Sequence, residues 1–208
     1  MTEKPTEQPT WGVGPFEGDP SKHPDFEKFD PELLAEGDTR NVVDYYRYWS
    51  MEAIVADLDS KRHGFHVAIE NWQHDLNIGS IVRTANAFLA KEVHIIGNRR
   101  WNRRGAMVTD RYQHVTHHPD VESFIKYIGE LPIIAIDNVP GCQKLEEYSP
   151  PKECVFLFGQ EGPGLSQAAL DSASAVLEIS QFGSTRSINA SAAAAITMHS
   201  WVTKHVFS

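Results

Sequence analysis

Five short apolar runs, separated by segments with a helical pattern, constrain the fold of this chain more than any other feature. The runs are nearly continuous rather than alternating in polarity, as in strands whose two faces are both buried. The alternation of strand and helix predicts an α/β fold with a mainly parallel sheet and helices on both faces. The runs cover residues 65–70, 92–97, 132–137, 154–159 and 175–180, and the helical patterns cover residues 79–90, 120–130, 165–173 and 188–206.

Acidic residues are concentrated in the first part of the chain. Residues 1–60 hold 14 acidic and five basic residues, a net charge of −9, whereas the rest of the chain holds 14 of each. Half of the twelve prolines precede residue 32, so we expect residues 1–38 to be an acidic, Pro-rich tail that is partly disordered. Apolar residues at helical spacing predict a helix over residues 40–60, within an N-terminal segment of residues 39–62. Residues 63–208 then form the α/β domain.

The composition excludes several classes of protein. No run of 18 apolar residues is present, and the polar N-terminus is unlike a signal peptide, so we expect no membrane partner. Cys142 and Cys154 form neither a C-x-x-C pair nor a disulfide framework, which indicates a reducing cytoplasm and no structural zinc site. The nearby His114, His117 and His118 are interpreted as a neutral surface cluster, and no metal site is expected.

The first of three loops that follow strands has the pattern N-x-G-x-x-x-R. Asn77, Gly79 and Arg83 carry this pattern where the chain enters the helix after the first strand. Gly79 lets a backbone or a ligand approach the start of the helix closely. An ordinary strand–turn–helix with a surface arginine would give the same three residues.

The second loop, residues 157–166, contains three glycines and a proline directly after a strand. This composition indicates a compact, constrained turn, in which Glu161 is able to anchor an arginine or accept a hydrogen bond. A glycine-rich turn without a function is the alternative. The loop is not a P-loop, because no G-K-[ST] follows.

The third loop joins a strand to the last helix. Ser187 and Asn189 lie at or next to the N-terminus of that helix. Either residue is able to act as a simple N-cap, but a helix N-terminus is also an anion-binding site. The sequence leaves both interpretations open.

Together, and in this order, the three loops resemble the signature motifs of the SpoU (TrmH-like) branch of the SPOUT RNA methyltransferases. The motifs correspond to residues 77–85, 158–165 and 179–191, and the resemblance covers roughly residues 63–206. Ser180 stands where the family usually has proline, and Ile188 stands where it often has leucine; neither departure removes a polar candidate for catalysis.

The resemblance implies a SPOUT fold with a C-terminal trefoil knot and a cytoplasmic homodimer. It also implies that the chain uses S-adenosylmethionine, without a metal, to methylate a ribose 2′-hydroxyl of tRNA or rRNA. The lack of a recognisable appended RNA-binding module favours tRNA. The residues that correspond to the family's cofactor pocket are Ile136, Gly159, Ile179, Ser187 and Ile188.

The same correspondence gives the candidates for catalysis: Arg83, Asn77, Glu161, Ser187 and Asn189. Arginine is a poor general base because its pKa exceeds about 12. We therefore expect Arg83 to bind a phosphate or stabilise the developing alkoxide, while the proton leaves through a phosphate oxygen, Ser187 or water. Asn77 and Asn189 would bind the ribose or orient Arg83, and Glu161 would fix this network by a charge-assisted hydrogen bond.

An arginine-rich segment, residues 98–118, follows the second strand and is expected to bind RNA. Its basic residues are Arg99, Arg100, Arg103, Arg104 and Arg111, and its Trp101 or Tyr112 is suited to stacking on a base. The alternative is a solvated basic loop that pairs with the acidic N-terminal segment.

The residues disfavour two alternative functions. A SPOUT protein that binds RNA without methylating it is disfavoured by the intact candidate residues. A dinucleotide-dependent dehydrogenase is disfavoured because no G-x-G-x-x-G follows the first strand.

Overall fold

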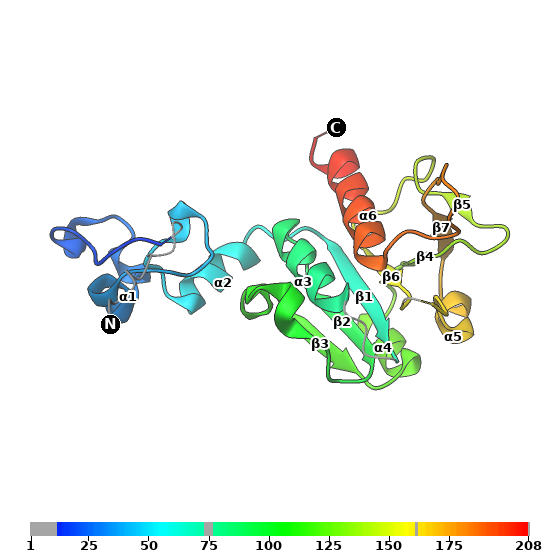
Figure 1. The fold of residues 1–208 in the computed structure, drawn as a ribbon, viewed down its shortest axis with the longest axis horizontal. Coiled ribbons are helices and arrows are strands. Elements are labelled where there is room, and N and C mark those ends of the chain that lie inside the picture. Colours follow the sequence, from blue (N-terminus) through cyan, green and yellow to red (C-terminus); the bar gives the residue numbers. More distant parts are fainter. Residues whose placement is uncertain (1–11, 73–76, 161, 208) are drawn as a thin grey trace, which may run out of the picture. The chain divides into compact units, whose positions relative to one another are not determined.

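A computed structural model describes residues 12–72, 77–160 and 162–207 of the chain (Figure 1). The backbone contacts divide the chain into two compact units, Met1–Ser60 and Lys61–Ser208. Among the described residues, no helix is long and apolar enough to cross a membrane.

The second unit is built on one seven-stranded sheet in the order β3-β2-β1-β6-β4-β7-β5, and every pair of neighbouring strands is parallel (Figure 1). This confirms the predicted parallel sheet. Because β6 pairs with both β1 and β4, the turn after β6 leaves the sheet at its centre. The strands are β1 (Phe65–Asn71), β2 (Val93–Gly97), β3 (Val115–His118), β4 (Ile133–Ile136), β5 (Gln143–Lys144), β6 (Cys154–Phe158) and β7 (Ala175–Glu178).

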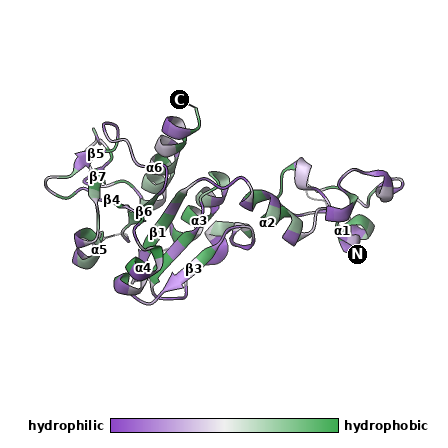
Figure 2. Ribbon diagram, turned by 180° about the vertical axis from the view of Figure 1, so that it is seen from behind, coloured by the Kyte–Doolittle hydropathy of each residue, from purple (hydrophilic) through white to green (hydrophobic). Residues whose placement is uncertain are grey.

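Helices cover both faces of the sheet, as predicted. Side chains of α3 and α6 join one buried cluster, and side chains of α4 and α5 join a second cluster on the opposite face. Figure 2 shows the apolar strands between these layers. The helices are α3 (Asn77–Ala87), α4 (Val121–Ile128), α5 (Gln167–Asp171) and α6 (Ala190–His205), and the 3₁₀ turns η4 (Arg103–Ala106) and η5 (Thr109–Arg111) lie between β2 and β3.

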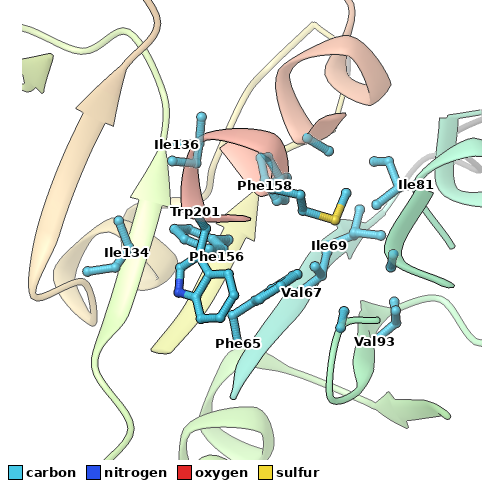
Figure 3. Packing of buried hydrophobic residues seen from close by; sticks show 14 of the residues in the cluster. Phe65, Val67, Ile69, Ile81, Val93, Ile134, Ile136, Phe156, Phe158 and Trp201 are labelled. Atoms are coloured by element: carbon cyan, nitrogen blue, oxygen red, sulfur yellow. The ribbon is translucent and has the colours of Figure 1, made fainter. Parts of the chain in front are cut away.

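Alternate residues of β1 explain why its sequence is almost continuously apolar. Phe65 and Val67 belong to the cluster under α3 and α6, whereas Ala68 belongs to the cluster under α4 and α5. In the first cluster the ring of Phe65 lies 4.7 Å from that of Trp201 and 6.0 Å from that of Phe156, between centroids (Figure 3). These large aromatic contacts attach α6 to the middle of the sheet.

Two strands, β3 and β5, were not expected from the sequence. In β3 the polar Thr116 and His118 alternate with Val115 and His117, so the strand lacks an apolar run. In β5 only Gln143 and Lys144 pair with β7, and both are exposed. Both strands lie at edges of the sheet, where pairing requires less apolar surface.

The predicted helix over residues 40–60 is wrong for its first half. The structure has a 3₁₀ turn η3 (Asp44–Tyr46) and then α2 (Met51–Asp59). Tyr48 has a φ of 65°, outside the helical range. The side chain of Ser50 accepts a hydrogen bond of 3.1 Å from the backbone N–H of Ala53 and so starts α2.

Residues 12–38 also differ from the expected tail, because they have structure of their own. Helix α1 (Pro31–Glu36) is capped by Asp30, and the 3₁₀ turns η1 (Pro20–Lys22) and η2 (Phe26–Lys28) precede it. The rings of Phe16, Phe29 and Tyr48 lie within 5.3–6.1 Å of one another, so aromatic side chains supply a small core.

A buried carboxylate ties this first unit together. Asp38 is fully buried, and its oxygens accept hydrogen bonds of 2.9 and 2.8 Å from the guanidinium of Arg40 and one of 3.1 Å from the backbone of Tyr48. Burial alone would raise the pKa of Asp38, but these donors outweigh burial and keep it below its ordinary value. One of the acidic residues of this segment therefore forms an internal ion pair, with Arg40, which the composition alone did not indicate.

The arginine-rich segment packs directly on the start of α3. A Cβ atom at Gly79 would lie 2.7 Å from the carbonyl oxygen of Asn102 and 2.8 Å from the backbone nitrogen of Ala106. A Cβ atom at Gly105 would in turn lie 2.9 Å from the backbone nitrogen of Ser80. The close approach expected at Gly79 is thus an approach of backbone, and it fixes the segment beside α3.

We predict that Gly79→Ala lowers the free energy of unfolding. Alanine favours a helix by about 1 kcal/mol over glycine, but the new methyl group meets backbone that is unable to move separately, and overpacking costs about 1–3 kcal/mol. Urea unfolding measures the net effect. Gly183→Ala is the control, because no atom lies within 4 Å of a Cβ there. Equal stability of the two variants would contradict the prediction.

Candidate functional site

A cavity of about 680 Å³ lies at the carboxyl ends of β4, β6 and β7. Its walls are the turn after β4, the glycine turn (residues 159–165) after β6, and the segment of residues 179–189 between β7 and α6. The carboxyl edge of a parallel sheet is where such folds bind ligands. All five residues predicted for the cofactor pocket line this cavity: Ile136, Gly159, Ile179, Ser187 and Ile188.

The glycine turn folds back tightly on itself. A Cβ atom at Gly159 would lie 2.3 Å from the carbonyl carbon of Gly164, which only glycine permits. Gly164 has a φ of +73°, and its N–H donates to the carbonyl of Gln160 at 3.3 Å. Asp137, at the end of β4, accepts a hydrogen bond of 3.0 Å from the backbone of Leu165. The turn is therefore fixed from within and from β4.

A buried glutamate fixes the other side of this turn. Glu70, the penultimate residue of β1, is fully buried. Its carboxylate accepts hydrogen bonds of 2.7 Å from both the backbone N–H and the hydroxyl of Ser166, and one of 3.0 Å from the indole of Trp72. The side chain of Gln160 accepts from the backbone of Trp72 at 3.2 Å. The ends of β1 and β6 are thus joined by polar contacts.

Asn77 and Asn189 meet although 112 residues separate them. The Nδ2 of Asn189 donates to Oδ1 of Asn77 at 2.8 Å. The Oδ1 of Asn189 caps α6, accepting from the backbone of Ser191 at 2.9 Å and of Ala192 at 3.3 Å. One side chain therefore serves both as the N-cap and as the contact between the starts of α3 and α6.

The remaining candidates for catalysis are placed differently. Ser187 is exposed and lines the cavity, next to Arg186, whose carbonyl accepts a hydrogen bond from the side chain of Asn138. Arg83 is exposed on α3 and does not line the cavity. Glu161 lies outside the described residues.

Sequence reasoning missed Glu70, Asp137 and Asn138. Each is a polar residue at or just after the carboxyl end of a buried strand. That position was a usable signal, because the carboxyl ends of parallel strands meet at one edge of the sheet.

The five predicted RNA-binding arginines, at positions 99, 100, 103, 104 and 111, are all exposed. Asn71, at the end of β1, donates from Nδ2 to the carbonyls of Asn98 at 2.7 Å and Arg100 at 2.9 Å. Arg103 pairs with Asp110 at 3.2 Å and lies over the ring of Trp101 at 5.5 Å. The segment therefore exposes arginine side chains, while hydrogen bonds from Asn71 hold its backbone in place.

Two side-chain expectations for this region are wrong. Tyr112 is buried, so its ring is not available to stack on a base. His118 is also buried, because β3 places it beneath α4 beside His94, whereas a surface cluster was expected. His117 lies apart from it and bonds the carbonyl of Gly97 at 2.7 Å.

Several known proteins are similar to this chain. A tRNA (guanosine(18)-2′-O)-methyltransferase of Thermus thermophilus is 26% identical over 142 residues, which cover 64% of this chain and 71% of that protein. The TrmH/SpoU tRNA modifying enzyme of A. aeolicus has a TM-score of 0.66 at 19% identity, covering 76% of this chain and 85% of that one.

The SpoU methyltransferase AviRb of Streptomyces viridochromogenes has a TM-score of 0.64 at 20% identity. The matched region covers 70% of this chain and 62% of AviRb. These likenesses show the SPOUT fold. The family described as "SpoU rRNA Methylase family" matches residues 64–199, most of the chain and all three motif loops. This chain therefore belongs to the SpoU rRNA methylase family.

Proposed function

We propose that this SpoU-family RNA methyltransferase acts on transfer RNA, and that S-adenosylmethionine binds in the cavity at the carboxyl edge of the sheet. The reaction of the family moves a methyl group from that cofactor to a ribose 2′-hydroxyl. The observation that carries the proposal is the cavity itself, which is formed jointly by the second and third motif loops and joined to the first through Asn189 and Asn77. Curated relatives that methylate the 2′-oxygen of tRNA guanosine 18 favour tRNA.

The residues present fit the cofactor. A volume of about 680 Å³ falls within the range of about 300–1,000 Å³ that is usual for small-molecule sites. Ile136, Ile179 and Ile188 supply apolar surface for an adenine ring, and the glycine turn exposes backbone groups without side chains. When bound, S-adenosylmethionine supplies a methyl group on a positively charged sulfur, so no metal is required for this transfer.

The chain's own residues position and activate the hydroxyl. Arg83 binds the adjoining phosphate or stabilises the developing alkoxide, because a guanidinium group is a poor general base. Asn77 and Asn189, already in contact, orient the ribose at the mouth of the cavity. Ser187 lines the cavity, and its hydroxyl is able to relay the proton. Positioning of this kind accounts for much of the acceleration of an in-line transfer.

The family resemblance supports three further proposals. The C-terminal part of the second unit forms a trefoil knot, the protein is a homodimer, and it works in the cytoplasm. The arginine-rich segment binds the phosphate backbone of the RNA, since its five arginines are exposed and its backbone is fixed by Asn71 and Gly79.

We predict that wild-type protein transfers a labelled methyl group to the 2′-oxygen of tRNA and that Arg83→Ala loses about 10²–10³-fold in kcat, the usual effect of removing one transition-state donor. Arg83→Lys should not restore the rate, because a planar fork and a point charge are not equivalent. Cofactor affinity should stay within twofold of wild type. RNA binding without any transfer by the wild type would instead support a non-catalytic binding protein, and full turnover by Arg83→Ala would exclude its role.

We predict that Glu70→Gln weakens cofactor binding about tenfold, which corresponds to about 1.4 kcal/mol. An amide at position 70 has one accepting oxygen instead of two and carries no charge. At least one donor of Ser166 or Trp72 then loses its acceptor, and the glycine turn is held less firmly. Calorimetric titration with S-adenosylmethionine measures the effect, and circular dichroism verifies the fold. Glu130→Gln, an exposed site after α4, is the control. Unchanged affinity in both variants would show that Glu70 does not position the turn.

We predict that replacing Arg99, Arg100, Arg103 and Arg104 by alanine flattens the salt dependence of RNA binding. Each phosphate contact contributes a slope of about 0.7–0.9 in log K against log salt, so four contacts contribute about 3. Affinity should fall alike for different RNAs, while cofactor affinity is kept. Binding curves at several salt concentrations measure the slope. A slope equal to that of the wild type would place the RNA surface elsewhere.

A further inference from the structure

Three histidines from adjacent strands form a row on the face of the sheet that α4 covers. Nδ1 of His66 in β1 lies 3.0 Å from Nε2 of His94 in β2, and Nδ1 of His94 lies 3.0 Å from Nε2 of His118 in β3. His94 is fully buried, His118 is nearly so, and His66 is partly exposed. The ring centroid of Phe124 in α4 lies 5.5 Å from those of both His94 and His118. None of these three histidines lines the cavity at the carboxyl edge of the sheet.

The carboxylate of Glu92 completes the cluster beside His66 and His94. Oε2 of Glu92 lies 3.9 Å from Nε2 of His94. One potential ligand atom each from His66, Glu92 and His94 all lie within 4.8 Å of one another. His66 is the second residue of β1 and Glu92 directly precedes β2. The cluster therefore lies at the amino edge of the sheet, whereas the cavity lies at the carboxyl edge.

We propose that His66, Glu92 and His94 bind one divalent transition-metal ion of the zinc class. Two imidazole nitrogens and one carboxylate oxygen are a usual set of three protein ligands for zinc, with a fourth position left for water. Tetrahedral bonds of about 2.0–2.1 Å place two nitrogen ligands about 3.3 Å apart. The nitrogens of His66 and His94, at 3.0 Å, need to separate by only a few tenths of an ångström.

Outer contacts orient these ligands for an ion between them. His118 bonds Nδ1 of His94, which leaves Nε2 of His94 directed toward His66 and Glu92. Thr116 donates its hydroxyl to Glu92, and the hydroxyl of Tyr127 lies 3.2 Å from Oε1 of the same carboxylate. Partners of this kind fix the tautomer and the direction of ligands in established metal sites.

The contact between His66 and His94 also suits a cation. At 3.0 Å the two facing nitrogens of His66 and His94 share one proton in the absence of an ion. When a metal ion takes the place of that proton, the proton moves to Nε2 of His66, so both imidazoles bind the ion in their neutral form. The bound ion would join β1 to β2 and stabilise the amino edge of the sheet.

The test is a titration of the full-length, tag-free protein with zinc chloride after removal of metal by a chelator. We expect calorimetry to give one ion per chain, a rise in Tm with zinc, and no such rise with magnesium chloride. Cobalt chloride should give the strong visible absorption of a tetrahedral site. Thr116→Val, which removes only an outer partner of Glu92, should weaken zinc binding about 10-fold, and His66→Gln, which removes a ligand itself, should weaken it by about 100-fold or more, the upper end of the effect of an outer partner.

Control variants separate this site from adventitious binding. His199→Gln removes an exposed histidine on α6 and should bind zinc as the wild type does. Glu92→Gln keeps the shape of the side chain and removes its charge, so it tests the cluster if His66→Gln folds poorly; circular dichroism verifies both folds. Zinc affinity unchanged in His66→Gln and Glu92→Gln, or no saturable zinc binding by the wild type, would overturn the proposal.

Discussion

The hydrogen bonds of one buried carboxylate, that of Glu70, determine how the functional edge of this protein is assembled. A fully buried charge is unfavourable unless donors surround it. Here the donors are Ser166, at the start of α5, and Trp72, directly after β1. Because these donors lie on segments that follow β6 and β1, their hydrogen bonds to one carboxylate hold the two segments together. The carboxylate of Asp137 likewise accepts a hydrogen bond from the backbone of Leu165, at the far end of the glycine turn.

Glycines allow these loops to approach each other at backbone distance. Gly159 permits the turn after β6 to fold back, and Gly79 permits the arginine-rich segment to pack on α3. The Asn77–Asn189 hydrogen bond then connects α3 with α6. The cofactor cavity and the basic surface are in this way attached to the same rigid elements, as positioning of a ribose beside a methyl donor requires.

The sequence predicted the central strands, because burial on both faces leaves a local pattern of continuous apolar runs. The pocket residues followed instead from the resemblance of the three loops to the SpoU motifs, and they line the cavity. The edge strand β3 was missed because Thr116 and His118 face α4 in a polar row that only the sheet register reveals. Likewise, no local pattern shows that Gly79 meets Gly105. In the first unit, no local pattern shows the positive φ of Tyr48 or the hydrogen bond from its backbone to the buried Asp38, ten residues away.

The central claim is that the cavity between the glycine turn and residues 179–189 holds S-adenosylmethionine. A crystal structure of the protein grown with S-adenosylmethionine tests this most directly. We expect one cofactor per chain, with its adenine between Ile136, Ile179 and Ile188 and its methyl group directed toward Asn189 and Ser187. Cofactor density at any other place on the chain, with this cavity filled only by solvent, would contradict it.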